Sequence, residues 1–349
     1  MKSIKELSLP ISEPEYRKLG GFSYSMLSKF QREGDPKSLI DTTKQDSESL
    51  RFGSLVDCLL TEPDTFKDRF IVTSIKSPPQ TIIYILQYII ESQETPPIYS
   101  KIPEELKIEA LNRFDYGTTW LISTRIKRLD EHAPYYNLLR KSSNKTIVTK
   151  EEYDLAINCI YILKNHPFTH KYMDDEEAFE DSIEKIYQLK FSSVYEGNLI
   201  RCMFDKLIVD HKSKTIQPID LKTSSKKEED FFKSALDWNY YLQATMYSQI
   251  LLDNILKDSY FKDFKILPFK FIVINKFSKS PLVWKYPLNI IDDLVIDPQE
   301  ELLQTHGYKN WKQLLSEASW HLNNEKFEYS YFSYLNNGEQ EINFSKLLH

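Results

Sequence analysis

The chain has 349 residues, of which 41% are hydrophobic and 13% aromatic, enough to exclude global disorder and to form one large domain or two modest ones. The net charge of −6 excludes a protein that coats nucleic acid through a uniformly basic surface, since such affinity comes from neutralised phosphates. A local basic groove beside a carboxylate-lined site is still compatible with this charge.

The first part of the chain, residues 1–75, is expected to lead into the main domain through short helices. The segment FSYSMLSKF at 22–30 offers serines that can cap one helix. The segment RFGSLVDCLLTEPDTF at 51–66 has apolar residues at helical spacing, and Pro63 ends the helix. Residues 70–72 then indicate a short strand.

Residues 76–178 are mainly helical by period and divided by prolines, which predicts a helical insertion. The main core is expected over 179–290, and residues 291–349 are expected to form a helical tail. Within the core, the pattern predicts strands at 183–191, 199–209, 215–222, 269–277 and 283–288, a turn at 210–214, and one long helix from 228 to 256. The expected fold is α/β, with a central mixed sheet flanked by helices.

Three polar residues stand in the predicted strand pair where apolar ones are expected. Asp220 and Lys222 are two apart and share one face of a strand, and Asp205 lies on the hairpin partner, close to opposite Ile219 or Asp220. Two converging carboxylates suit a hard cation such as Mg²⁺, and a lysine beside it can position a water that the metal acidifies. Solvated charges at strand ends are the competing interpretation, since D-x-K triplets are common.

The context of this triplet resembles the PD-(D/E)xK nuclease superfamily, most closely its RecE-type (exonuclease VIII-like) phage recombination exonucleases. The segments that carry the resemblance are FSYSMLSKF, RFGSLVDCLLTEPDTFKDRFIV, FEDSIEKIYQLKF, LIRCMFDKLIV, IDLKTS and YYLQATMYSQIL, in the family's order. The resemblance implies a restriction-endonuclease-like core and a Mg²⁺- or Mn²⁺-dependent exonuclease that resects double-stranded DNA ends in recombination or repair.

The resemblance also assigns roles to individual residues. Asp205 and Asp220 would bind the metal with the Leu221 carbonyl, and Lys222 would position the water. Two departures stand out, because Phe204 replaces a proline and Asp57 replaces a metal-binding histidine. Aspartate is itself an oxygen ligand for Mg²⁺ or Mn²⁺, so Asp57 is expected to stay a ligand; an exposed residue beside an apolar helix face is the alternative.

Three further residues have an open role. Glu184 is either a metal ligand or a charge at a strand edge. Gln243 and Tyr247 are four apart on the long helix and share a face. By resemblance they contact the DNA backbone or the catalytic lysine; otherwise that face packs on the sheet, with Tyr247 in the core.

Basic residues near the site and in the helical insertion are candidates for DNA contacts, although lysine pairs are usually solvated. They are Arg201, Lys226, Lys227, Arg125 and Arg128.

Other chemistries lack a motif. There is no phosphate-binding GxxxxGK[ST], no GxGxxG and no GxSxG, and the three cysteines form no CxxC pair. The N-terminus lacks a secretory signal and no stretch approaches the about 20 apolar residues of a membrane span. We therefore expect a cytoplasmic protein without membrane contact.

Two alternatives to the exonuclease stay open: an endonuclease of repair or defence on the same fold, and a noncatalytic DNA-binding scaffold. The resemblance allows two partners besides DNA, a second copy of the chain and a single-strand annealing protein.

Overall fold

The computed structural model describes residues 1–41, 47–142, 145–175, 182–224 and 226–339. It divides the chain into two compact units, one of Met1–Ser49 with Tyr161–His349, the other of Leu50–Ile160. The end of the expected tail, 340–349, and residues 179–181 of the FEDSIEK segment lie outside the described residues. No helix among the described residues is long and apolar enough to cross a membrane.

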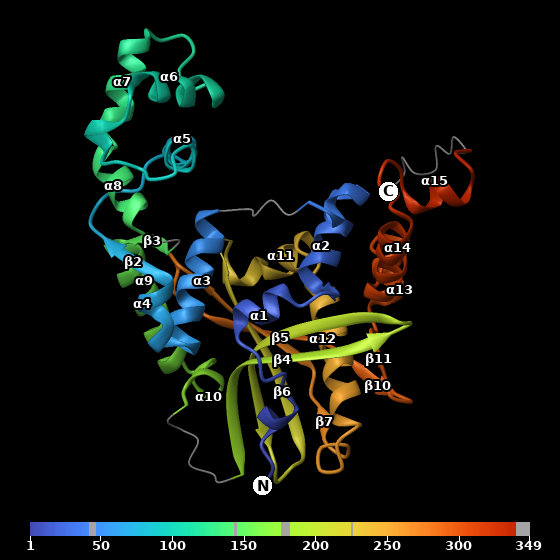
Figure 1. Cartoon of the computed structure of the whole chain (residues 1–349). Helices are drawn as coiled ribbons and strands as arrows, with labels where there is room; N and C mark the ends of the chain where they lie inside the picture. The colour runs from blue at the N-terminus through green and yellow to red at the C-terminus, as the bar shows by residue number, and fades with distance from the viewer. Residues whose placement is uncertain (42–46, 143–144, 176–181, 225, 340–349) are drawn as a thin grey trace. The chain divides into compact units, whose positions relative to one another are not determined.

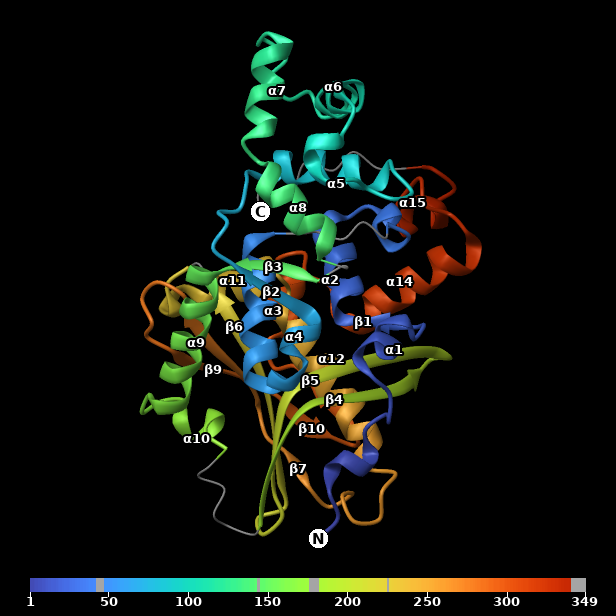
Figure 2. The same ribbon diagram turned by 60° about the vertical axis from the view of Figure 1, so that its left-hand side comes forward.

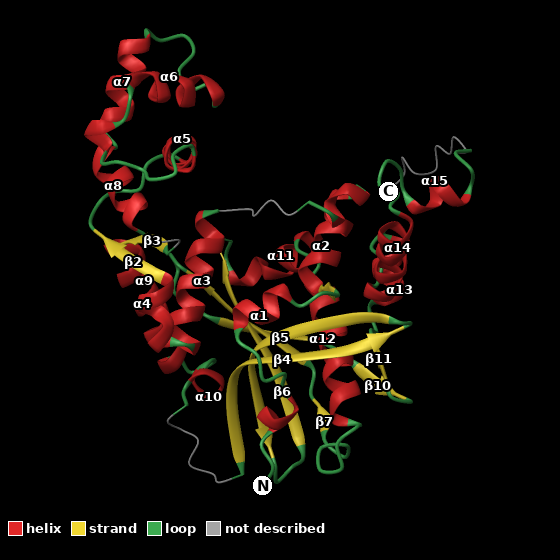
Figure 3. Ribbon diagram, viewed as in Figure 1, coloured by secondary structure: helices red, strands yellow, loops and turns green. Residues whose placement is uncertain are grey.

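The first unit is organised around one mixed sheet, which Figure 3 colours yellow. Its strands are β1 (Phe22–Ser23), β4 (Ile183–Tyr195), β5 (Asn198–Asp210), β6 (Thr215–Ser224), β7 (Lys265–Ile266), β8 (Phe269–Asn275) and β9 (Leu282–Tyr286). The strands β4, β5 and β6 pair antiparallel in sequence, β8 then joins β6 in parallel, and β9 pairs antiparallel with β8. The α/β class with a mixed sheet is confirmed.

The predicted hairpin forms with the expected turn. Lys206 pairs with Ile219 and Asp210 with Thr215, and the Asp210 carboxylate accepts hydrogen bonds from the backbone N–H groups of Lys212 and Ser213. An aspartate that bonds the backbone two and three residues onward stabilises a tight turn. This turn sets the register of the hairpin, and with it the residues that face each other across β5 and β6.

The helix α12 (Tyr240–Ile255) packs along β4 and β5, as Figures 1 and 2 show. It is buried over almost its whole circumference, which fits its largely apolar sequence YYLQATMYSQILLDNI. The unit's other helices are α1 (Glu13–Lys18), α2 (Tyr24–Glu33), α10 (His170–Met173), α11 (Phe231–Asp237), α13 (Glu300–Thr305), α14 (Trp311–Asn324) and α15 (Tyr331–Leu335).

Two predictions about this unit need correction. The single helix expected over 228–256 is broken into a short 3-10 turn, α11 and α12, because Asn239 adopts the left-handed conformation at φ 55°. The tail expected to be helical from 291 begins with a two-stranded ribbon, β10 (Asn289–Ile291) and β11 (Leu294–Ile296). Val295 of that ribbon is buried and its N–H donates to Gln249 of α12, so tertiary contacts select the strand.

The second unit is mainly helical, as predicted for most of this zone. Its helices are α3 (Glu48–Thr61), α4 (Phe66–Arg69), α5 (Gln80–Glu91), α6 (Glu104–Arg113), α7 (Ile122–Asp130), α8 (Ala133–Lys141) and α9 (Lys150–Asn165), with α3 beginning and α9 ending in the first unit. The predicted strand at 70–72 is β2 (Phe70–Thr73), and it pairs in parallel with β3 (Thr146–Thr149). That pairing places a strand inside the zone expected to be helical.

Candidate active site

The candidate site lies where β5 separates from β6. On one side, β5 pairs with β6 over residues 206–210 and with β1 over residues 200–201. The ladder is therefore interrupted over residues 202–205, and β6 continues beside β8 alone. One step beyond the pair Lys206–Ile219, Asp205 and Asp220 stand opposite each other at this fork. Residues opposite each other in an antiparallel pair project to the same face.

Backbone and carboxylate meet across the fork. The Leu221 N–H donates to Asp205 Oδ2 over 2.8 Å, which takes the place of the missing ladder bond. In an extended strand the N–H and C=O of one residue point to the same side, so the Leu221 carbonyl also faces the fork. The fork therefore brings together the two aspartates and one backbone carbonyl.

Asp220 is a buried carboxylate in which one oxygen accepts no hydrogen bond from the described residues. Its Oδ1 accepts a hydrogen bond from Gln243 Nε2, and Gln243 is 3% exposed. Its Oδ2 forms an ion pair with the Lys222 ammonium at 2.7 Å but accepts no hydrogen bond within the described residues. A buried acceptor without a donor costs about 1–3 kcal/mol. Gln243 Oε1 is likewise buried without a donor in the described ranges.

Lys222 is held by one carboxylate and aromatic rings. Its Nζ lies 4.5 Å from the centroid of the Tyr240 ring, and Tyr24 packs beside that ring at 6.3 Å. Burial by itself lowers the pKa of Lys222, but the charge of Asp220, supported by Tyr240, Tyr24 and Asp205, raises it above its usual value. The side chain is thus an ammonium that donates hydrogen bonds.

These residues fit a divalent cation. The donor set is two carboxylates and a carbonyl, the hard oxygen ligands that Mg²⁺ and Mn²⁺ prefer, and the unsatisfied Asp220 Oδ2 is an acceptor that a cation would satisfy. No three His, Cys, Asp or Glu side chains gather as a metal cage anywhere in the described ranges. Mg²⁺ does not need one, because it usually keeps several waters and takes one or two protein carboxylates.

A family comparison agrees with this geometry. Residues 23–280, more than half of the chain, match the family described as a PDDEXK-like domain of unknown function (DUF3799). The chain belongs to this family. The match confirms the PD-(D/E)xK superfamily and, with the mixed sheet above, the restriction-endonuclease-like fold. No curated protein matches the chain.

Membership in the PDDEXK-like family indicates a nuclease with DNA as its substrate, and nucleases of this superfamily generally use divalent metals. The matched range contains Asp205, Asp220 and Lys222, and it also includes Tyr24 near its start. The comparison therefore supports the class of chemistry that the donor set at the fork suggests.

Three residues at the PDDEXK-like site were not foreseen from the sequence. Gln188 lies opposite Asp205 by the register of β4 and β5, is buried, and has a left-handed φ of 55° inside a strand, a strained conformation that is frequent at functional sites. Tyr24 and Tyr240, which surround Lys222, lie within segments that carry the family resemblance, so that resemblance was the available signal.

The structure does not bring Glu184 to the two aspartates. Glu184 pairs with Val209, four residues along β5 from Asp205, about 13 Å for an extended strand. Its carboxylate accepts hydrogen bonds from the Ser3 hydroxyl and the Ile4 N–H, and His211 Nε2 lies 3.6 Å away. Glu184 thus anchors the N-terminal segment. The pattern of the strand alone could not predict this contact, because its partners lie about 180 residues earlier.

Two aromatic positions belong to the core rather than to the surface. Tyr247 is 9% exposed and packs edge-on against Phe204 and Phe269, at 5.4 and 6.4 Å. Burial, with smaller effects of Asp220 and Asp205, raises its pKa well above the usual value. This matches the packing alternative for Tyr247, although the charges of both aspartates reach it. Phe204, in the position of the family's proline, is fully buried in the same cluster.

Asp57 lies in the second unit, on α3, and is half-buried. Its backbone carbonyl accepts a hydrogen bond from the Thr61 hydroxyl. Its role as a ligand stays a prediction.

The predicted DNA-binding residues fall into two groups. Arg125 is 7% exposed and donates to Asn112, so the structure places most of this side chain inside the second unit. Arg201 donates to the Tyr16 carbonyl and stacks on its ring, which ties α1 to the sheet. The exposed residues are Lys226, paired with Asp237, Arg128, near Glu131, and Lys227.

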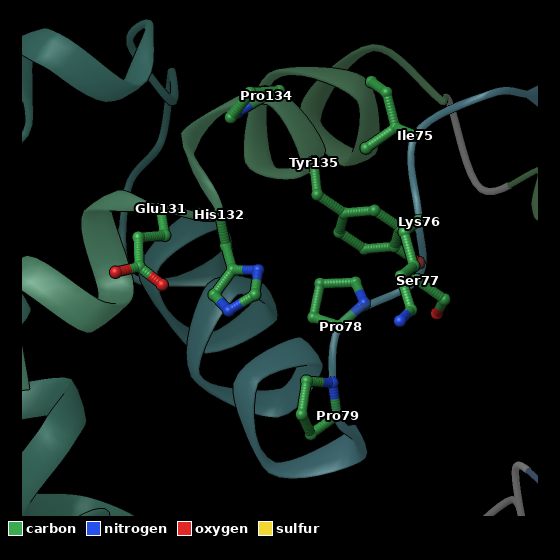
Figure 4. Close-up of a pocket in the computed structure, with 9 residues that line it drawn as sticks. All are labelled: Ile75, Lys76, Ser77, Pro78, Pro79, Glu131, His132, Pro134 and Tyr135. Atoms are coloured by element: carbon green, nitrogen blue, oxygen red, sulfur yellow. The ribbon is translucent and has the colours of Figure 1, made fainter.

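One cavity of about 540 Å³ lies within the second unit (Figure 4). Its lining combines the prolines and Tyr135 with Glu131 and His132 at one side and Lys76 at the other (Figure 4), and burial lowers the pKa of His132. None of the residues proposed below for catalysis lines it, so it is not part of the site at the fork.

Proposed function

We propose that this PDDEXK-like domain is a Mg²⁺-dependent deoxyribonuclease, with Mn²⁺ as a substitute, that hydrolyses phosphodiester bonds at the β5–β6 fork. The observation that carries the proposal is the buried Asp220 carboxylate, whose Oδ2 has an ammonium beside it but no hydrogen-bond donor in the described chain. A structural ion pair would satisfy both oxygens, whereas a metal ligand keeps one available.

The chain's residues divide the work among them. Asp205, Asp220 and the Leu221 carbonyl would hold the metal. When bound, the metal lowers the pKa of a coordinated water and offsets charge on the phosphate. Lys222, as an ammonium, donates to the attacking water or to a non-bridging phosphate oxygen and so orients the attack. Gln243 holds Asp220 through Oδ1, which leaves Oδ2 directed to the metal.

Further ligands and partners rest on the resemblance to RecE-type exonucleases. It supports Asp57 as an additional oxygen ligand and exonucleolytic resection of double-stranded DNA ends in recombination or repair. It also supports a cytoplasmic enzyme, a homo-oligomer and a single-strand annealing protein as partner. The exposed Lys226 and Lys227, which follow the D-x-K strand, would contact the DNA backbone.

The deciding experiment compares linear and closed circular duplex DNA of one sequence, each incubated with Mg²⁺. The linear DNA is labelled at either its 5′ or its 3′ ends. We expect the linear DNA to be degraded from its ends while the circle persists. Nicking or linearisation of the circle would instead indicate the endonuclease. The absence of any Mg²⁺- or Mn²⁺-dependent cleavage would contradict the proposal and favour a DNA-binding scaffold. The variants Asp220→Ala and Lys222→Ala serve as inactive controls.

A further inference from the structure

The break between α11 and α12 exposes a tryptophan next to the candidate site. Trp238 is 42% exposed, and the residue after it, Asn239, is buried in the left-handed conformation at φ 55°. A non-glycine residue held in this region costs of order 1–3 kcal/mol and persists only where surrounding contacts enforce it. The break therefore has a structural cause that can be traced.

Contacts from α2 enforce the break. The Trp238 carbonyl accepts hydrogen bonds from the Tyr24 hydroxyl over 2.6 Å and from the Ser28 hydroxyl over 2.7 Å. The Asn239 side chain donates to the Ser28 carbonyl. The backbone at the break is thus held on its inner side, and the indole is presented outward on a rigid base.

A guanidinium lies over the exposed indole. The Arg32 guanidinium carbon is 4.4 Å from the centroid of the Trp238 ring, and Arg32 Nε donates to the Ser28 carbonyl. Arg32 is exposed and forms no ion pair with an acid within the described part of the chain, unlike Lys226 and Lys233 nearby, which pair with Asp237 and Asp230. An unneutralised arginine on a tryptophan attracts a polyanion and stacks on planar groups.

Trp238 is connected to the candidate site through Tyr24 and Tyr240. Tyr24, which holds the Trp238 carbonyl, packs 6.3 Å from Tyr240, and the Tyr240 ring lies 4.5 Å from Lys222 Nζ. The same residue, Asn239, precedes α12 and so sets where Tyr240 and Gln243 stand. The Trp238 backbone is therefore linked through Tyr24 to the aromatic residues that surround Lys222.

We propose that Trp238 and Arg32 form a stacking site for one unpaired nucleobase of the strand that enters the β5–β6 fork. Inside a duplex, stacking on the neighbouring base pairs covers both faces of each base, and pairing keeps a base from turning outward, so the site takes a frayed or single-stranded end and not a fully paired one. This inference rests on the proposed nuclease function, and it names the form of DNA that the site accepts.

The test measures binding without cleavage, in EDTA, by the fluorescence anisotropy of two labelled DNAs, a (dT)12 single strand and a blunt 20-base-pair duplex. We expect Trp238→Ala to weaken binding of (dT)12 by about 5- to 100-fold, the loss of one stacked base. Trp238→Phe should restore most of it. Binding of the duplex should change by less than about twofold, because it contains no unpaired base that could enter the site singly.

A matched control is Tyr329→Ala, which removes another exposed aromatic side chain of the same unit and should leave both affinities unchanged. Equal single-strand affinity of wild type and Trp238→Ala would overturn the inference, as would an equal loss for both DNAs or no binding of (dT)12 by wild type. A loss specific to (dT)12 in a protein that cleaves nothing would support the stacking site while the proposed nuclease function failed. Melting curves confirm that each variant is folded.

Discussion

Two acidic residues of the sheet, Glu184 on β4 and Asp220 on β6, differ in how their oxygens are bonded. Glu184 accepts hydrogen bonds with both oxygens, from the Ser3 hydroxyl and the Ile4 N–H, and ties the N-terminus to the sheet. Asp220, at the fork, keeps Oδ2 without a donor among the described residues although it is buried. A satisfied carboxylate stabilises the fold, whereas an unsatisfied one stores free energy that a ligand can release.

The largest expected effect comes from removing a charge at the fork. Asp205→Asn keeps an oxygen that can accept from the Leu221 N–H, so the fold should persist while Mg²⁺-dependent cleavage falls on the order of 10³-fold. At a tenfold excess over its Kd, Mg²⁺ should stabilise the wild type by about 1.4 kcal/mol and the variant much less. Thermal melting with and without Mg²⁺ measures this. Equal Mg²⁺ stabilisation of both proteins would place the metal elsewhere.

A smaller loss is expected from the residue that orients Asp220. Gln243→Leu removes the donor to Oδ1 with little change of volume and should lower cleavage by about 10- to 100-fold. Steady-state cleavage rates at saturating Mg²⁺ measure it.

The matched control for that variant lies on the same helix. Gln249 is equally buried, and it bonds Asp253 and the Val295 N–H instead of the fork. Gln249→Leu should cost a similar stability, about 1–3 kcal/mol, with no loss of activity per folded molecule. If both variants lost activity alike, Gln243 would be a packing residue only.

The smallest effect on cleavage is expected for Glu184, which pairs with Val209 four residues along β5 from Asp205. Glu184→Gln makes the same charge-removing change as Asp205→Asn but should leave cleavage by the folded protein unchanged. It should lower the free energy of unfolding by about 1–3 kcal/mol, because it weakens the bonds from Ser3 and Ile4. Urea unfolding measures the stability. A loss of activity as large as that of Asp205→Asn would remove the contrast between the two carboxylates.

Elements whose signals are local along the chain could be predicted from the amino-acid sequence. Two runs of β-branched and aromatic residues separated by a turn at 210–214 predict the β5–β6 hairpin, and they place Asp205 close to opposite Ile219 or Asp220. The register of the hairpin in the structure puts it opposite Asp220. The ordered segments of the family resemblance are local in the same sense, and the family match confirms their superfamily. The site roles of these residues stay predictions that the variants above test.

Features that depend on contacts between distant segments became visible in the tertiary structure alone. The helical period runs on through Trp238 and Asn239, and the break there appears because Tyr24 and Ser28, more than 200 residues earlier, bond that backbone. By its residue type Arg125 is expected at the surface, but in the structure it is buried and donates to Asn112. By its strand position Glu184 is a candidate ligand, but its carboxylate accepts a hydrogen bond from the Ile4 N–H. Side-chain hydrogen bonds between remote segments leave no periodic trace in a sequence, since each residue's type is compatible with several partners.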